Sequence, residues 1–183
     1  MQTELLLAGF GGQGVLFLGD LLARAAMAKG LNTTYMPTYG VAMRGGTANC
    51  VVVMSDDPIG SPVMDAPDVA IILNQQSFDK FQPAIKKGGL IVANAAMVSR
   101  DSFVRADDLR LVMVPATSIS RDIMGKEVAT NMAALGAYLA SDDTLTYDIV
   151  EEVLRANLDP SKHALLEPNL KVIRAGMEAA AGA

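Results

Sequence analysis

Apolar and polar positions follow two periods in turn along the chain, and this succession predicts strands and helices that alternate. A short apolar run at residues 4–8 predicts a first strand, and apolar residues at helical spacing predict a helix over residues 13–29. Gly30 follows that helix and suits the residue that ends it. A strand, a glycine-containing turn and a helix in this order are typical of the first unit of a nucleotide-binding α/β domain.

The rest of the chain continues the same succession. The run 69–73 is apolar throughout, which is typical of a strand inside a parallel sheet with both faces covered. Further strands are expected at 32–36, 47–55, 90–93 and 111–114, and further helices at 77–86, around Ile119, and at 128–141, 146–157 and 167–183. In the helix at 128–141, the expected packing stripe consists of Met132, Leu135, Gly136 and Leu139. We therefore expect one α/β domain over residues 1–183, with about six strands in a mostly parallel central sheet and helices on both faces.

The stretch from Gly9 to Gly14, with the sequence GFGGQG, separates the first strand from the first helix. Gly9 suits a tight turn, and Gly11 and Gly12 would expose bare backbone N–H groups. Gly14 would let the helix pack closely on the strand. Because a helix N-terminus also carries partial positive charge, Gly11, Gly12, Gln13 and Gly14 are candidates for holding an anion. The alternative is that the glycines only let the strand lead into the helix.

A second glycine-rich loop follows the second strand. Arg44 stands beside Gly45 and Gly46, and a guanidinium next to free backbone N–H groups suits an anion clamp. The alternative is a surface loop with a solvated arginine. Asn74 follows the apolar strand at 69–73, at the strand end where open α/β sheets bind ligands. Its alternative role is to cap the next helix.

Composition excludes several classes of function. The net charge is −5, so the chain has no basic field for nucleic acid. It has one Cys, which excludes a disulfide framework and a cluster held by four thiolates within this chain. The single His, His163, lies in a polar stretch typical of a surface, which disfavours a His/Cys metal site and a Ser-His-Asp triad. Cys50 lies in a strand-like run and is expected to be buried. No signal peptide and no membrane-spanning run is apparent, so a cytoplasmic location is expected.

Two further observations concern partners and cofactors. The mean hydropathy of +0.29 is high, which a buried parallel sheet explains, as would a surface covered by partner subunits. A dinucleotide site would need an acidic residue about 20 positions after the glycine turn to hold the ribose. The second strand instead ends in Pro37-Thr38-Tyr39-Gly40, which disfavours an NAD-dependent dehydrogenase.

Three stretches together resemble a known family. They are GFGGQGV at 9–15, then Tyr39-Gly40 followed by MRGGT at 43–47, then SDDPIGSP at 55–62. Their order and spacing resemble the gamma subunit of 2-oxoacid:ferredoxin oxidoreductases, which matches domain III of the single-chain pyruvate enzymes. The resemblance covers about residues 4–140.

The resemblance implies a Rossmann-like three-layer α/β sandwich in an enzyme that oxidatively decarboxylates a 2-oxoacid to an acyl-CoA and reduces ferredoxin. It implies thiamine diphosphate, Mg and iron–sulfur clusters on other chains, and alpha, beta and ferredoxin-like delta subunits as partners. In the family this domain is associated with coenzyme A access, so the glycine turn and Arg44 are expected to contact either coenzyme A or a neighbouring subunit. The isolated chain is expected to be inactive.

Two other functions stay open at the level of the sequence. The chain would suit a stand-alone nucleotide- or acyl-CoA-binding protein, and the isolated chain would suit a homodimer. An NAD-dependent dehydrogenase is the third reading, against which the missing ribose acid counts.

Overall fold

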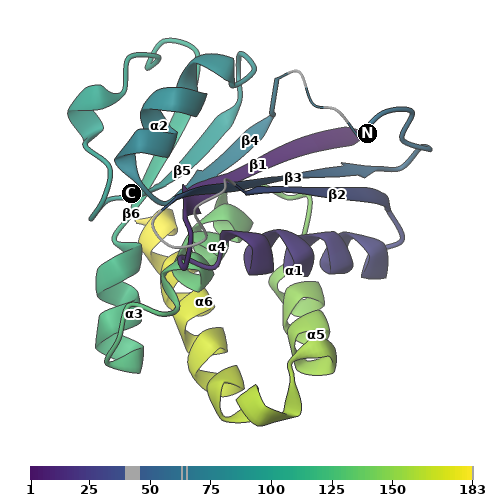
Figure 1. The fold of residues 1–183 in the computed structure, drawn as a ribbon, viewed down its shortest axis with the longest axis vertical. Coiled ribbons are helices and arrows are strands. Elements are labelled where there is room, and N and C mark those ends of the chain that lie inside the picture. Colours follow the sequence, from purple (N-terminus) through teal and green to yellow (C-terminus); the bar gives the residue numbers. More distant parts are fainter. Residues whose placement is uncertain (40–45, 63, 65, 183) are drawn as a thin grey trace.

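A six-stranded sheet forms the centre of the molecule in the computed structural model, which describes residues 1–39, 46–62, 64 and 66–182 (Figure 1). The strand order across the sheet is β2-β3-β1-β4-β5-β6. The strands are β1 (Gln2–Phe10), β2 (Asn32–Tyr39), β3 (Thr47–Ser55), β4 (Val69–Ile72), β5 (Leu90–Asn94) and β6 (Arg110–Val114). The strand at 69–73 was expected to be central, and β4 indeed lies between β1 and β5.

The sheet is mostly parallel, as the sequence predicted. Strands β1, β4, β5 and β6 pair in parallel, whereas β3 runs antiparallel to both of its neighbours, β1 and β2. The first strand of the chain therefore has β3 on one side and β4 on the other. This is the point where the strand order reverses, and the carboxyl end of β1 opens there.

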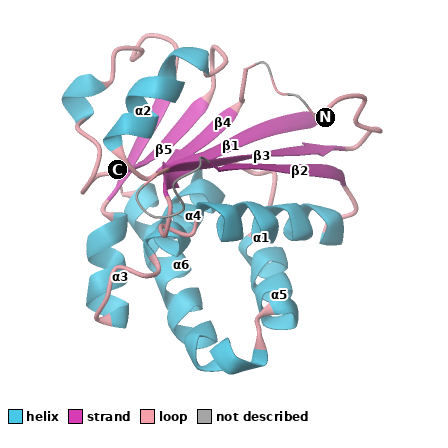
Figure 2. Ribbon diagram, in the orientation of Figure 1, coloured by secondary structure: helices cyan, strands magenta, loops and turns pink. Residues whose placement is uncertain are grey.

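Helices cover both faces of the sheet, but unequally. They are α1 (Val15–Ala28), α2 (Gln75–Phe81), α3 (Ala116–Met124), α4 (Thr130–Ser141), α5 (Tyr147–Asn157) and α6 (Leu166–Ala181). Figure 2 shows α2 on one face and α1 with α3–α6 on the other. Helix α2 is shorter than the predicted helix at 77–86. It continues as a 3-10 turn at Gln82–Ala84, where Pro83 lacks the N–H that a further α-helical turn needs.

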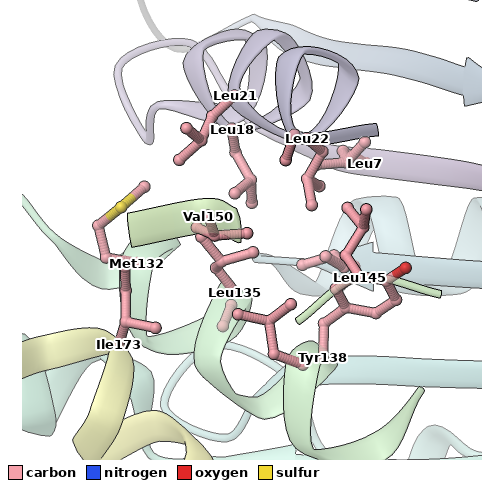
Figure 3. Packing of buried hydrophobic residues seen from close by; sticks show 14 of the residues in the cluster. Leu7, Leu18, Leu21, Leu22, Met132, Leu135, Tyr138, Leu145, Val150 and Ile173 are labelled. Atoms are coloured by element: carbon pink, nitrogen blue, oxygen red, sulfur yellow. The ribbon is translucent and has the colours of Figure 1, made fainter. Parts of the chain in front are cut away.

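Two apolar clusters follow from the alternation of side chains along the strands. Leu5 and Leu7 of β1 face the larger cluster, and Leu6 faces the smaller one under α2. In the larger cluster, Figure 3 shows side chains of α1 meeting side chains of α4, with Val150 of α5 and Ile173 of α6 beside them. The core is therefore built mainly from aliphatic residues, as the low aromatic content required.

Helix α4 is buried on all sides. Every residue from Thr130 to Leu139 is buried, so the expected stripe of four residues was too narrow. The reason is that α4 lies between the sheet and α6, and it crosses α6 at backbone contact. A Cβ on Gly136 would lie 1.9 Å from the carbonyl oxygen of Ile173, and a Cβ on Gly176 would lie 2.1 Å from that of Ala133.

Candidate functional site

The glycine stretch forms the connection from β1 to α1, but its glycines have different roles from those predicted. Gly9 lies within β1, so it does not make the turn. A Cβ at Gly9 would lie 2.7 Å from Oε1 of Gln13 and 2.9 Å from Cγ2 of Val15. Gly9 therefore provides the close strand–helix packing that was assigned to Gly14.

Gly14 makes the turn. Its φ of 74° is left-handed, a conformation that costs side chains free energy, and it caps the N-terminus of α1. A Cβ at Gly14 would lie only 2.4 Å from Nδ2 of Asn131, which comes from α4. Gly12 is also left-handed, with a φ of 99°, but nothing lies within 4 Å of its missing Cβ.

Asn131 is a site residue that the sequence interpretation missed. Its Nδ2 donates to the Gly14 carbonyl at 3.1 Å, and its Oδ1 accepts from the Met132 N–H at 3.0 Å. The side chain is 4% exposed, so both of its polar atoms need these partners. A polar residue at the start of a buried helix was the available signal, but its partner lies 117 positions away in sequence.

The backbone N–H groups of the turn are only partly free. The Gly11 N–H donates to the Gly46 carbonyl at 2.9 Å. The prediction that Gly11 exposes a bare N–H group was therefore wrong. This bond continues the antiparallel pairing of β1 with β3 by one residue beyond Phe10. Within the described part of the chain, the N–H groups of Gly12, Gly14, Val15 and Leu16 have no acceptor. These are the donors that a helix N-terminus leaves for a ligand or for water.

Gln13 and Asn74 meet at the carboxyl ends of β1 and β4. Oε1 of Gln13 accepts from the Phe10 N–H at 2.7 Å, and Nε2 of Gln13 donates to the Leu73 carbonyl at 3.4 Å. Nδ2 of Asn74 lies 3.5 Å from Oε1 of Gln13, and Oδ1 of Asn74 accepts from the Ser77 N–H at 2.8 Å. Asn74 therefore caps α2, the alternative role that the sequence left open, and it is buried at 1% exposure.

A hollow of about 520 Å³ lies beside the turn. It is bounded by the turn, the first residues of α1 and the start of β3, and most of its lining is apolar. The described residues that line it are Phe10, Gly11, Gly12, Gly14, Val15, Leu16, Phe17, Gly46, Thr47 and Ala48. Phe17, which the sequence interpretation did not single out, is 45% exposed at its edge. The predicted clamp residues Arg44 and Gly45 lie outside the described residues, and Gly46 lies at the wall.

The titratable groups near the turn do not suggest acid–base chemistry. Burial raises the pKa of the Cys50 thiol to about 12, and its Sγ lies 3.6 Å from the Val15 carbonyl, so the thiol is neutral at physiological pH. No acidic residue occupies the first turn of α1. In the described residues no group of three or more His, Cys, Asp or Glu side chains is placed to hold a metal ion. Among the described residues, the arrangement offers backbone donors and an apolar wall, which are features that suit the binding of a ligand.

In the described part of the chain, no helix is both long enough and apolar enough to span a bilayer.

Comparison with known proteins gives relatives over almost the whole chain. Subunit VorA of the ketoisovalerate oxidoreductase of Methanothermobacter marburgensis is 37% identical over 178 residues, which cover 97% of this chain and 36% of that protein. Subunit KorC of the 2-oxoglutarate synthase of Methanocaldococcus jannaschii is 32% identical over 181 residues, which cover 98% of this chain and 95% of that protein. The chain thus spans about a third of the VorA length and nearly all of KorC.

Solved structures share the fold. The gamma subunit of a keto/oxoacid ferredoxin oxidoreductase from Geobacter sulfurreducens is 25% identical with a TM-score of 0.85, over 100% of this chain and 98% of that one. A 2-oxoglutarate:ferredoxin oxidoreductase from Magnetococcus marinus, solved with 2-oxoglutarate, coenzyme A and succinyl-CoA, has a TM-score of 0.89 over 31% of its chain. At 22% identity, this second likeness concerns the fold alone.

The family model described as pyruvate ferredoxin/flavodoxin oxidoreductase matches residues 4–179. The chain belongs to the pyruvate ferredoxin/flavodoxin oxidoreductase family.

Proposed function

We propose that residues 1–183 form one gamma domain of a 2-oxoacid:ferredoxin oxidoreductase, an enzyme that converts a 2-oxoacid to an acyl-CoA and reduces ferredoxin. The observation that carries the proposal is the coverage: the chain matches KorC over 95% of its length and a gamma-subunit structure over 98% of its length. The same segment corresponds to 36% of the longer VorA. The domain therefore serves either as a separate subunit or as part of a larger chain.

The division of labour follows from the residues present. One Cys cannot supply the four thiolates of an iron–sulfur cluster, so we place the clusters of the enzyme outside residues 1–183. Thiamine diphosphate and Mg are assigned to the alpha and beta subunits, and electron transfer to ferredoxin is assigned to a ferredoxin-like delta subunit. Within this scheme the present chain binds and orients, and it has no redox centre of its own.

Coenzyme A is the ligand that we propose for this site. The N–H groups of Gly12 and Gly14, which have no acceptor among the described residues, suit an anionic phosphate oxygen, and the helix N-terminus favours negative charge there. The apolar lining of the hollow suits the uncharged parts of the molecule. We assign Arg44 to a coenzyme A phosphate or to a carboxylate of a neighbouring subunit.

The experiment is steady-state kinetics of the complex that forms when the chain is co-expressed with its candidate alpha, beta and delta subunits. In the phosphate role, Arg44→Ala and Arg44→Lys raise the KM for coenzyme A and leave the KM for the 2-oxoacid unchanged, because lysine lacks the planar two-pronged contact. In the interface role, the same variants fail to assemble. A chain that binds acyl-CoA but never associates with such subunits would contradict the proposal and favour a stand-alone binding protein.

A further inference from the structure

The side chain of Gln13 takes the place of a rung in the sheet. Ala8 pairs with Ile72 in the parallel ladder of β1 and β4, and the Leu73 N–H donates to the Ala8 carbonyl at 2.9 Å. In a continued parallel ladder, the Leu73 carbonyl would next accept from the Phe10 N–H. That bond is not made among the described residues.

The Gln13 carboxamide stands between these two groups. Its Oε1 accepts from Phe10 at 2.7 Å, and its Nε2 donates to Leu73 at 3.4 Å. One side-chain amide thus satisfies both the donor of β1 and the acceptor of β4, as a peptide group would. Gly9 permits this, because a Cβ there would lie 2.7 Å from the same Oε1.

This position is the one that ligands take in many open α/β sheets. Ligands bind outside the carboxyl ends of the strands where the strand order reverses, which here is between β1 and β4. Since Gln13 and the buried Asn74 occupy that crevice, the space left open at the turn lies on the opposite side, against β3. Gly46, Thr47 and Ala48 form that wall of the hollow.

We propose that Gln13 is a positioning residue: its carboxamide closes the crevice between β1 and β4 and fixes the turn, so that the phosphorylated ligand binds on the β3 side. Gln13 itself does not contact the ligand, although the sequence made it a candidate contact. The ligand part of this inference rests on the proposed function.

The test compares Gln13→Ala and Gln13→Met in the assembled complex. Methionine has a similar volume and fills the crevice, but it makes neither hydrogen bond. Gln13→Met therefore separates the loss of the hydrogen bonds from the loss of packing. The matched control is Gln75→Ala, because Gln75 is half-buried like Gln13 and bonds Asp79, Ser99 and Ser102 rather than the turn. Both Gln13 variants should raise the KM for coenzyme A roughly tenfold, the effect of about one lost hydrogen bond, with kcat and the 2-oxoacid KM within about twofold of wild type.

A second readout uses the isolated full chain and needs no ligand. Hydrogen exchange of the Phe10 amide should be slow in the wild type and in Gln75→Ala, and faster in both Gln13 variants. Unchanged exchange at the Phe10 amide would overturn the inference that the Gln13 carboxamide holds this amide. Faster exchange with an unchanged coenzyme A KM, or wild-type kinetics in Gln13→Met, overturns the positioning role. A wild-type complex without oxidoreductase turnover contradicts the proposed function instead, and the wild-type control shows this before any variant is compared.

Discussion

Gly14 combines a left-handed backbone with a buried amide from another helix next to its Cα. Gly30 has a similar φ of 89° but nothing within 4 Å of its missing Cβ, so it isolates the backbone effect. We expect Gly30→Ala to lower the free energy of unfolding by about 1 kcal/mol, and Gly14→Ala to lower it by roughly 3 kcal/mol, because Nδ2 of Asn131 must also move. Urea denaturation measures both. Equal losses would show that Asn131 yields without cost.

Cys50 makes alkaline stability a second test at the scale of one residue. Burial raises the pKa of its thiol from 9.0 to about 12, so above pH 9 the unfolded chain releases this proton while the folded chain keeps it. Stability from this group is therefore complete below pH 9 and falls as the pH rises toward 12. At pH 10 the loss is about 1.4 kcal/mol. Denaturation of wild type and Cys50→Ala at pH 7 and pH 10 should give the variant a smaller pH dependence, and equal slopes would contradict the assignment.

The sequence indicated which residues form the turn but not which structural role each of them has. GFGGQG predicted a strand, a turn and a helix, and all three exist. The roles of Gly9 and Gly14 were exchanged, since spacing alone does not tell which glycine lies in the strand. The contact of Gly14 with Asn131 joins residues 117 positions apart, and no local pattern carries that information.

At the scale of elements, the crossing of α4 and α6 depends on two glycines. Gly136→Ala would normally favour a helix by about 1 kcal/mol. Here the added Cβ would lie 1.9 Å from the Ile173 carbonyl, a backbone atom that cannot rotate away. We therefore expect Gly136→Ala to separate the helices and to cost roughly 3 kcal/mol or more in the free energy of unfolding.

Gly19 of α1 provides the matched control for this prediction. A Cβ there would lie 2.5 Å from Sγ of Cys50 and 2.9 Å from the Tyr35 ring, which are side-chain atoms. Because side chains adjust more readily than backbone, Gly19→Ala should cost less than Gly136→Ala, and Cys50→Ala should reduce its cost further. Thermal denaturation of Gly136→Ala, Gly19→Ala and the double variant Gly19→Ala with Cys50→Ala ranks their stabilities. A larger loss of stability for Gly19→Ala than for Gly136→Ala would contradict the backbone-contact argument.

Most elements were predictable because each has a periodicity of its own. The strand at 47–55 was predicted with the bounds that β3 has, and the expected helix at 146–157 differs from α5 by one residue. What the pattern did not give is which strands are neighbours. The insertion of β3 between β2 and β1 depends on pairing across the sheet, and one chain read in sequence leaves that pairing undetermined.

For the whole molecule, two features agree with the proposal that this chain is a subunit of a larger assembly. Of the described α-helices, one face of the sheet carries only α2 (Figure 2), and several apolar side chains are exposed. Phe17, Val128 and Leu165 are 45%, 67% and 43% exposed. All three residues line one hollow, although they come from α1, from the segment before α4 and from the segment before α6. Exposed apolar side chains that gather at one hollow are typical of an interaction site, which agrees with the proposed role as a subunit.

We expect the purified chain to show no reduction of dyes or NAD with any 2-oxoacid, and no visible absorbance from an iron–sulfur cluster. The reason is that one Cys cannot hold such a cluster, and no acidic residue stands at the end of the second strand to bind a ribose. The measurement is an anaerobic assay of the pure chain beside the co-expressed complex, which serves as the positive control. Turnover by the chain alone would contradict the proposed division of labour.

The hydrogen bond from Asn131 to Gly14 also bears on the order in which the chain folds. Strand β1 precedes its two neighbours in the sheet, which begin at Thr47 and Val69, and the amide that bonds its turn comes later still, in α4. During translation the glycine turn therefore lacks that partner until α4 has been made. We therefore expect a chain truncated before α4 to contain the glycine stretch without the hydrogen bond that Asn131 donates to Gly14.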